Sequence, residues 1–132
     1  MSITKNAGRQ ELVAAYVDVA LADLATGVAQ AAIDLPIGAV IVEGEIVVTE
    51  AFNSTSTDVL DVGYAGAENG YKNDANIHTT GIVALVPTGY QHLATTPAVK
   101  CTWVSGGGTP TTGAFRLAVR YFVAGRAAFS QG

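Results

Sequence analysis

Alternation of apolar and polar residues is the main pattern along the chain, and it predicts β-strands. The clearest case is the segment 114–124, in which every odd position from Phe115 to Val123 is apolar or aromatic. The even positions include Arg116 and Arg120. Successive side chains of a strand point to opposite faces, so this segment is predicted to bury one face and to expose the two arginines.

Seven further segments have strand-like patterns bounded by turn residues such as Gly and Pro. Segment 98–104 repeats the alternation, with Val99, Cys101 and Trp103 predicted on the inner face. The eight predicted strands are residues 11–24, 28–35, 40–52, 57–62, 81–86, 88–93, 98–104 and 114–124.

Two of these segments allow a second interpretation. Residues 11–24 alternate like a strand, but an Ala-rich helical stripe of Val13, Val17, Leu21 and Leu24 also fits. We favour the strand. Residues 40–52 fit either one long strand with a bulge at Gly44 or a tight hairpin. We favour the long strand, because the apolar even positions before and after Gly44 stay in phase.

One long stretch shows no hydrophobic period, and we predict a loop from Gly63 to Thr80. Loops of more than about 12–15 residues inside a compact domain are usually functional or disordered. We expect this loop to pack over one end of the domain and to form part of a contact with another subunit or partner.

Composition supports an all-β fold. The chain contains 16 Val and 7 Ile against 8 Leu, and β-branched side chains suit a pleated sheet. About eight strands with turns between them predict a β-sandwich of the jelly-roll type. We expect a flexible N-terminal arm at residues 1–10, one sandwich domain at 11–124 and a C-terminal tail at 125–132.

Charge is unevenly distributed. Residues 1–74 hold three basic and eleven acidic side chains, 3 − 11 = −8, whereas residues 75–132 hold four basic and no acidic ones, +4. This fits either one mixed surface or two complementary faces that help subunits pack. An acidic chain is a poor nucleic-acid binder. It has no apolar run long enough to span a membrane and no secretory signal, and its single Cys101 fits a reducing compartment.

Catalytic and metal-binding chemistry find little support. Asp58, Asp61, Glu68, Asn73 and Asp74 could supply oxygen ligands to Ca²⁺. Their spacing matches no calcium loop, and Asp58 and Asp61 are predicted to point to opposite faces of one strand. We therefore expect solvated loop acids, or Asx turns that hold the backbone of the loop, and no cofactor.

A thiol enzyme would need Cys101 beside His78 or His92 as its base. We expect Cys101 instead to be a buried and inert apolar filler.

Contact chemistry is the better-supported possibility. Arginines on an open sheet face, and tyrosines amid Gly and Asn, are typical of interfaces, although they also occur as solvated or domain-pinning side chains. The candidate interface residues are Tyr64, Tyr71, Lys72, Asp74, Arg116, Arg120, Phe122, Arg126 and Phe129.

Several segments together resemble the capsid decoration, or cement, proteins of tailed bacteriophages. The resemblance is carried by residues 23–39, 47–63, 71–76 and 125–132. It implies a jelly-roll-like protein without enzymatic activity, made in the host cytoplasm and located on the capsid exterior of the virion. It further implies binding to the major capsid protein, stabilisation of its lattice, and self-association as a trimer or dimer, with no nucleic-acid or membrane partner.

Two other function classes compete with this one. A glycan-binding sandwich, such as a virion adhesin, would use Tyr64, Tyr71, Tyr90 or Trp103 as stacking platforms, and burial of Trp103 would count against it. An enzyme of the cupin or thiol type lacks the required metal or nucleophile cluster in the sequence.

Overall fold

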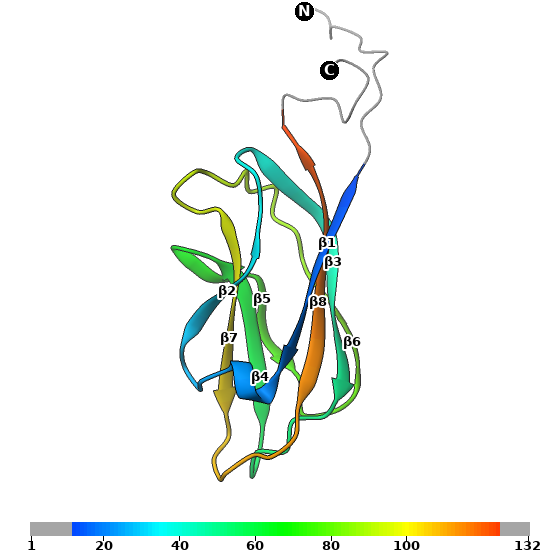
Figure 1. The fold of residues 1–132 in the computed structure, drawn as a ribbon, viewed down its shortest axis with the longest axis vertical. Coiled ribbons are helices and arrows are strands. Elements are labelled where there is room, and N and C mark those ends of the chain that lie inside the picture. The colour runs from blue at the N-terminus through cyan, green and yellow to red at the C-terminus, as the bar shows by residue number, and fades with distance from the viewer. Residues whose placement is uncertain (1–11, 125–132) are drawn as a thin grey trace, which may run out of the picture.

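The described part of the protein consists of two antiparallel sheets of four strands each (Figure 1). The structure, a computed structural model, describes residues 12–124, so the predicted arm at 1–10 and tail at 125–132 lie outside the described residues. The strands are β1 (Val13–Ala20), β2 (Ala29–Asp34), β3 (Ala39–Glu50), β4 (Asp58–Tyr64), β5 (Ala67–Asn76), β6 (Gly81–Ala84), β7 (Ala98–Ser105) and β8 (Ala114–Val123). A single 3₁₀ turn, η1 (Leu21–Asp23), separates β1 from β2, and no helix among the described residues could cross a membrane.

Nested strand pairing defines the topology. One sheet has the order β1-β8-β3-β6 and the other β2-β7-β4-β5. The first strand therefore pairs with the last, the second with the seventh, the third with the sixth and the fourth with the fifth. The paired strands then fold over on themselves, so that β3 also pairs with β8 and β4 also pairs with β7. This is the arrangement of a jelly roll, and it confirms the predicted fold class.

Both sheets contribute their inner faces to one core. The alternation predicted for β7 and β8 is confirmed, since Val99, Cys101 and Trp103 are buried together with Phe115 and Leu117. Phe52 joins the sheets at one end, because its ring lies 5.8 Å from that of Trp103 and 6.2 Å from that of Phe115.

The ambiguous first segment is a strand, as predicted, and the helical alternative is wrong. β1 pairs along its whole length with β8, so that Val19 lies opposite Phe115 and Val13 opposite Tyr121. Pairing with β8 buries Val19 in the core. Tertiary pairing has therefore overridden the helical propensity of the alanines in this segment.

The third segment is one long strand, as predicted, but its bulge is not at Gly44. The register shifts between Ile41 and Glu43, which makes Val42 the extra residue, and it shifts again between Val48 and Glu50. Ala39 and Ile41 face inward before the bulge, and Gly44, Ile46 and Val48 do so after it. The prediction that the apolar even positions on both sides of Gly44 share one face of the strand is therefore wrong. Gly44 is needed for close packing, because a Cβ there would lie 2.7 Å from the carbonyl oxygen of Ala118.

The predicted long loop from Gly63 to Thr80 is wrong. Most of it is strand β5, which forms a hairpin with β4. Two register shifts and the left-handed backbone of Asp74, φ 52°, interrupt the alternation, so that only Tyr71 and Ala75 are buried. An edge strand with two irregularities carries no regular hydrophobic period, and this is why the sequence pattern failed.

The predicted strand at 88–93 is also wrong. These residues belong to the long β6–β7 connection, and their one sheet contact is the isolated bridge between Val40 and Gln91. The described residues nevertheless contain eight strands, the number predicted, because β5 takes the place of this segment.

Candidate functional site

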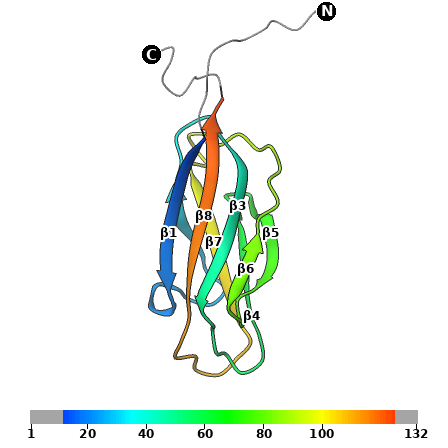
Figure 2. The same ribbon diagram turned by 90° about the vertical axis from the view of Figure 1, so that its right-hand side faces the viewer.

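In Figure 2 the sheet β1-β8-β3-β6 faces the viewer. Its outward face carries ion pairs centred on β8. Arg116 lies between β1 and β3, and its guanidinium donates two hydrogen bonds to Asp18, of 2.7 and 3.0 Å. Its Cζ lies 4.1 Å from the centre of the Tyr16 ring. These hydrogen bonds raise the pKa of Arg116 above its ordinary value, and the Tyr16 ring adds a cation–π contact.

Arg120 lies beside the bulge of β3 and is paired with two carboxylates. Its guanidinium donates to Glu45 and to Glu43, and the hydrogen bonds raise its pKa. The acids of the first half of the chain therefore meet the bases of the second half within one subunit. This arrangement agrees with the mixed-surface interpretation of the charge asymmetry.

Two buried aromatic groups fix the β6–β7 connection to β5. The His92 Nδ1 lies 2.8 Å from the Thr96 carbonyl oxygen, which can only accept, so Nδ1 carries the proton. The Nε2 atom then accepts from the Tyr71 hydroxyl at 2.8 Å. Burial lowers the pKa of His92 and raises that of Tyr71, so both groups are neutral near pH 7.

Tyr64 and Tyr90 cover this pair from outside. Their rings stack at 3.7 Å between centres and 8° between planes. Tyr71 is only 1% exposed and Trp103 is buried, so neither offers a ring face to a ligand. Since Tyr64 and Tyr90 each cover one face of the other, the burial of Trp103 and this stacking count against the glycan-binding alternative.

A buried carboxylate, Asp58, joins four segments of the chain. It is fully buried at the start of β4 and accepts four hydrogen bonds. Ser54 donates two, from its backbone N–H at 3.0 Å and its hydroxyl at 2.6 Å. Trp103 Nε1 donates at 2.8 Å and His78 Nδ1 at 2.7 Å. The Ser54 hydroxyl also lies 2.7 Å from that of Ser105.

Two opposing effects act on the pKa of Asp58. Burial acts to raise it, and the hydrogen bonds from Ser54, His78 and Trp103 together outweigh burial, so the pKa lies below its usual value. The carboxylate is therefore ionised. Asp58 occupies the central position between Ser54 and His78, so the group lacks the serine–histidine contact of a hydrolase. Its effect is to lock β4, β7 and two end loops together.

Sequence reasoning placed Asp58 among solvated loop acids, and this is wrong. A signal was available, because Asp58, Leu60 and Val62 share the inward phase of one strand. Asp61 points to the opposite face, as predicted, and accepts from the Asp74 backbone N–H at 2.7 Å. Among residues 12–124, no three His, Cys, Asp or Glu side chains are grouped as a metal would require.

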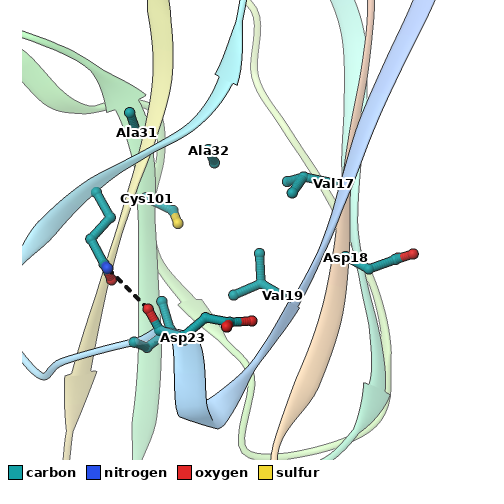
Figure 3. A pocket seen from close by; sticks show the side chains of 9 residues that line it. Val17, Asp18, Val19, Asp23, Ala31, Ala32 and Cys101 are labelled. Carbon is teal, nitrogen blue, oxygen red and sulfur yellow. Dashed lines mark hydrogen bonds between the residues drawn. The ribbon is translucent and has the colours of Figure 1, made fainter.

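A cavity of about 290 Å³ opens between the edge strands β1 and β2. Figure 3 shows Val17, Val19 and Ala32 turned into it from the two strands, with the Cys101 thiol at its back. The Gln30 amide donates to the Asp23 carbonyl oxygen at 2.9 Å, and its Oε1 is buried without a partner in the structure. Burial raises the pKa of Cys101 to about 11, as expected of an inert thiol.

The candidate interface residues are not gathered in one place. Tyr71 lies in the core, and Tyr64 is half-buried beneath Tyr90. Lys72 and Asp74 lie on the edge strand β5 of one sheet. The remaining described candidates, Arg116, Arg120 and Phe122, lie on β8 of the other sheet, and Arg126 and Phe129 lie outside the described residues.

Comparisons with known proteins support the fold and not a family. No protein-family model and no curated protein matches the sequence. The structure is similar to a chain of the cyanophage Pam1 capsid asymmetric unit, with a TM-score of 0.71, 21% identity, and coverage of 93% of this chain and 91% of that chain.

Two further solved structures have the same fold. A chain in the acidic stable capsid structure of Helicobacter pylori bacteriophage KHP30 has a TM-score of 0.64 and 17% identity, with 87% of this chain and 90% of that chain covered. A chain in the capsid of Ralstonia phage GP4 has a TM-score of 0.62 and 19% identity, with 96% and 92% covered. At these identities the similarity establishes a shared jelly-roll fold over nearly the whole chain.

Proposed function

We propose that this protein is a non-enzymatic structural component of a phage virion, which binds the outer surface of the capsid and stabilises the major-capsid lattice. The observation that carries the proposal is the similarity to the chain of the cyanophage Pam1 capsid, which covers 93% of this protein at a TM-score of 0.71. Chains of two other phage capsids have the same fold.

The physical properties of the sandwich support this role. Asp58 and the Tyr71–His92 pair tie the end loops to the sheets through buried hydrogen bonds. A rigid body of this kind loses little conformational entropy when it is held between lattice subunits. Self-association as a dimer or trimer would multiply the contacts, because each further contact of a bound oligomer is effectively intramolecular.

Capsids assembled without this protein provide the test. Adding the purified protein should give saturable binding at a fixed copy number, and it should raise the temperature at which the capsids break and release their DNA. Cleavage of the bound protein by a protease that cannot enter the capsid would identify the exterior location. Saturated capsids that break at the same temperature as bare ones would refute the stabilising role.

A further inference from the structure

One end of the sandwich is apolar, and its exposed side chains come from segments far apart in the sequence. Ile37 is 67% exposed, Leu93 52%, Leu12 50% and Val13 46%. We call these four residues the apolar end. Isolated exposed hydrophobic residues are common on proteins, but a group of them at one place marks a contact surface.

Backbone hydrogen bonds bring the segments of the apolar end together. The Gly38 N–H donates to the His92 carbonyl at 2.8 Å, which places the turn containing Ile37 beside the loop containing Leu93. The Ala124 N–H donates to the Gly38 carbonyl at 2.8 Å, which adds the end of β8. β1 begins beside the end of β8, since Val13 pairs with Tyr121. In Figure 1 these segments meet at the top of the sandwich.

The four segments that form the apolar end hold no charged side chain themselves, although Asp34 and Glu68 lie nearby. These segments, 12–15, 35–42, 85–97 and 121–124, contain no Asp, Glu, Lys or Arg. His92 is buried and neutral. At the opposite end, the loops 21–28, 51–57, 77–80 and 106–113 are rich in Ser, Thr and Gly, and Val28 is their one exposed large apolar residue. The two ends therefore suit different neighbours, and the apolar end suits an uncharged one.

The described part of the chain begins at Leu12 and ends at Ala124, and both residues lie at the apolar end. Residues 1–11 precede Leu12 and residues 125–132 follow Ala124, and together they hold three basic side chains and one acidic, 3 − 1 = +2. Residues 12–124 hold four basic and ten acidic side chains, 4 − 10 = −6. Basic segments that start beside an apolar patch favour a partner with acidic residues around its own apolar patch.

We infer that the apolar end is the surface that docks on the capsid, and that it binds an uncharged apolar patch bordered by acidic residues. The inference rests on the proposed function and specifies its contact surface. The opposite, hydroxyl-rich end then points away from the capsid. The strands of both sheets then run perpendicular to the capsid surface. A second copy of this chain is the competing occupant of the apolar end, and the experiment below separates the two.

The test uses the full chain with the double substitution Ile37→Glu and Leu93→Glu. Its matched control is Val28→Glu with Val104→Glu, two residues of similar exposure, 48% and 43%, away from the apolar end. Binding to capsids lacking this protein is measured by co-sedimentation, the oligomeric state by light scattering, and folding by thermal melting. We expect the double variant to bind at least about tenfold more weakly, because a buried unpaired carboxylate replaces an apolar contact.

The control should bind like the unaltered chain, and both variants should melt within a few degrees of it. Equal binding by both variants would overturn the inference and leave the proposed function intact. Failure of the unaltered chain to bind would overturn both. Normal capsid binding together with loss of an oligomer would assign the apolar end to a second copy and overturn the inference. If the Glu variant fails to fold, Ile37→Ser with Leu93→Ser replaces it. If the affinity for capsids does not change with salt concentration, the inferred acidic residues around the partner's apolar patch are wrong.

Discussion

Asp58→Asn alters the hydrogen-bonding capacity of the buried network while keeping its shape. The carboxylate accepts on both oxygens, from the Ser54 hydroxyl and Trp103 on Oδ1 and from the Ser54 N–H and His78 on Oδ2. An amide keeps one oxygen and presents an NH₂ group to two donors. Each buried donor left without an acceptor costs about 1–3 kcal/mol, so we expect the free energy of unfolding to fall by about 4 kcal/mol.

Urea unfolding provides the assay, and Trp103 is the reporter because it is the single tryptophan of the chain and binds Asp58 directly. With an m-value of about 2 kcal/mol per molar urea, the midpoint should fall by about 2 M. The same loss corresponds to a decrease in Tm on the order of 15 °C. A graded series strengthens the test, since Ser54→Ala removes one hydroxyl donor and should cost about 1 kcal/mol.

Asp61→Asn is the matched control for Asp58→Asn. Asp61 lies on the same strand, faces outward and accepts one backbone hydrogen bond. We expect a loss below about 1 kcal/mol from this substitution. Equal losses from Asp58→Asn and Asp61→Asn would refute the assignment of Asp58 as the point that holds the end loops to the sheets.

Four further predictions concern other positions. Gly44→Ala should destabilise the fold by about 1–3 kcal/mol in urea unfolding, because its Cβ would lie 2.7 Å from the Ala118 carbonyl and 2.8 Å from Leu85 Cδ1; an unchanged midpoint would contradict this. Tyr71→Phe should cost about 1–2 kcal/mol by the same assay, since His92 Nε2 loses its donor. The pKa of His92 is lowered in the fold, so stability should be full above about pH 6.5 and fall as the pH drops towards the folded pKa; unfolding curves that coincide between pH 7 and 5 would exclude this. Cys101, whose pKa is raised to about 11, should resist a disulfide reagent near pH 8 in the native protein and react once urea has unfolded the chain.

The fold could be read from the sequence where one face of a strand is buried and the other exposed. β7 and β8 meet this condition, and their alternation placed Trp103, Phe115 and the two arginines correctly. β5 does not meet it, because it is an edge strand with two register shifts, and its polar residues were taken for a loop. Periodicity fails where a bulge changes the phase, as Val42 does in β3.

The candidate site was less predictable because it depends on contacts distant in sequence. Arg116 and Arg120 were correctly placed on the outer face, yet their carboxylate partners are 98 and 75–77 residues away and follow from strand order alone. The apolar end was missed for the same reason. Ile37 and Leu93 are unremarkable in their own turns and become neighbours through the bonding of Gly38 to His92.

Nested strand pairing has a consequence for how the chain folds during synthesis. Of the strands in residues 12–124, β8 is made last, and it lies between β1 and β3 in the centre of its sheet. Until β8 emerges, β1 has no strand to pair with, and β3 has β6 alone. Such non-local pairing closes very long loops and is typical of slow folding, in milliseconds to seconds. We therefore expect the chain to complete its fold only after β8 leaves the ribosome, so that exposed strand edges must be protected from aggregation until then.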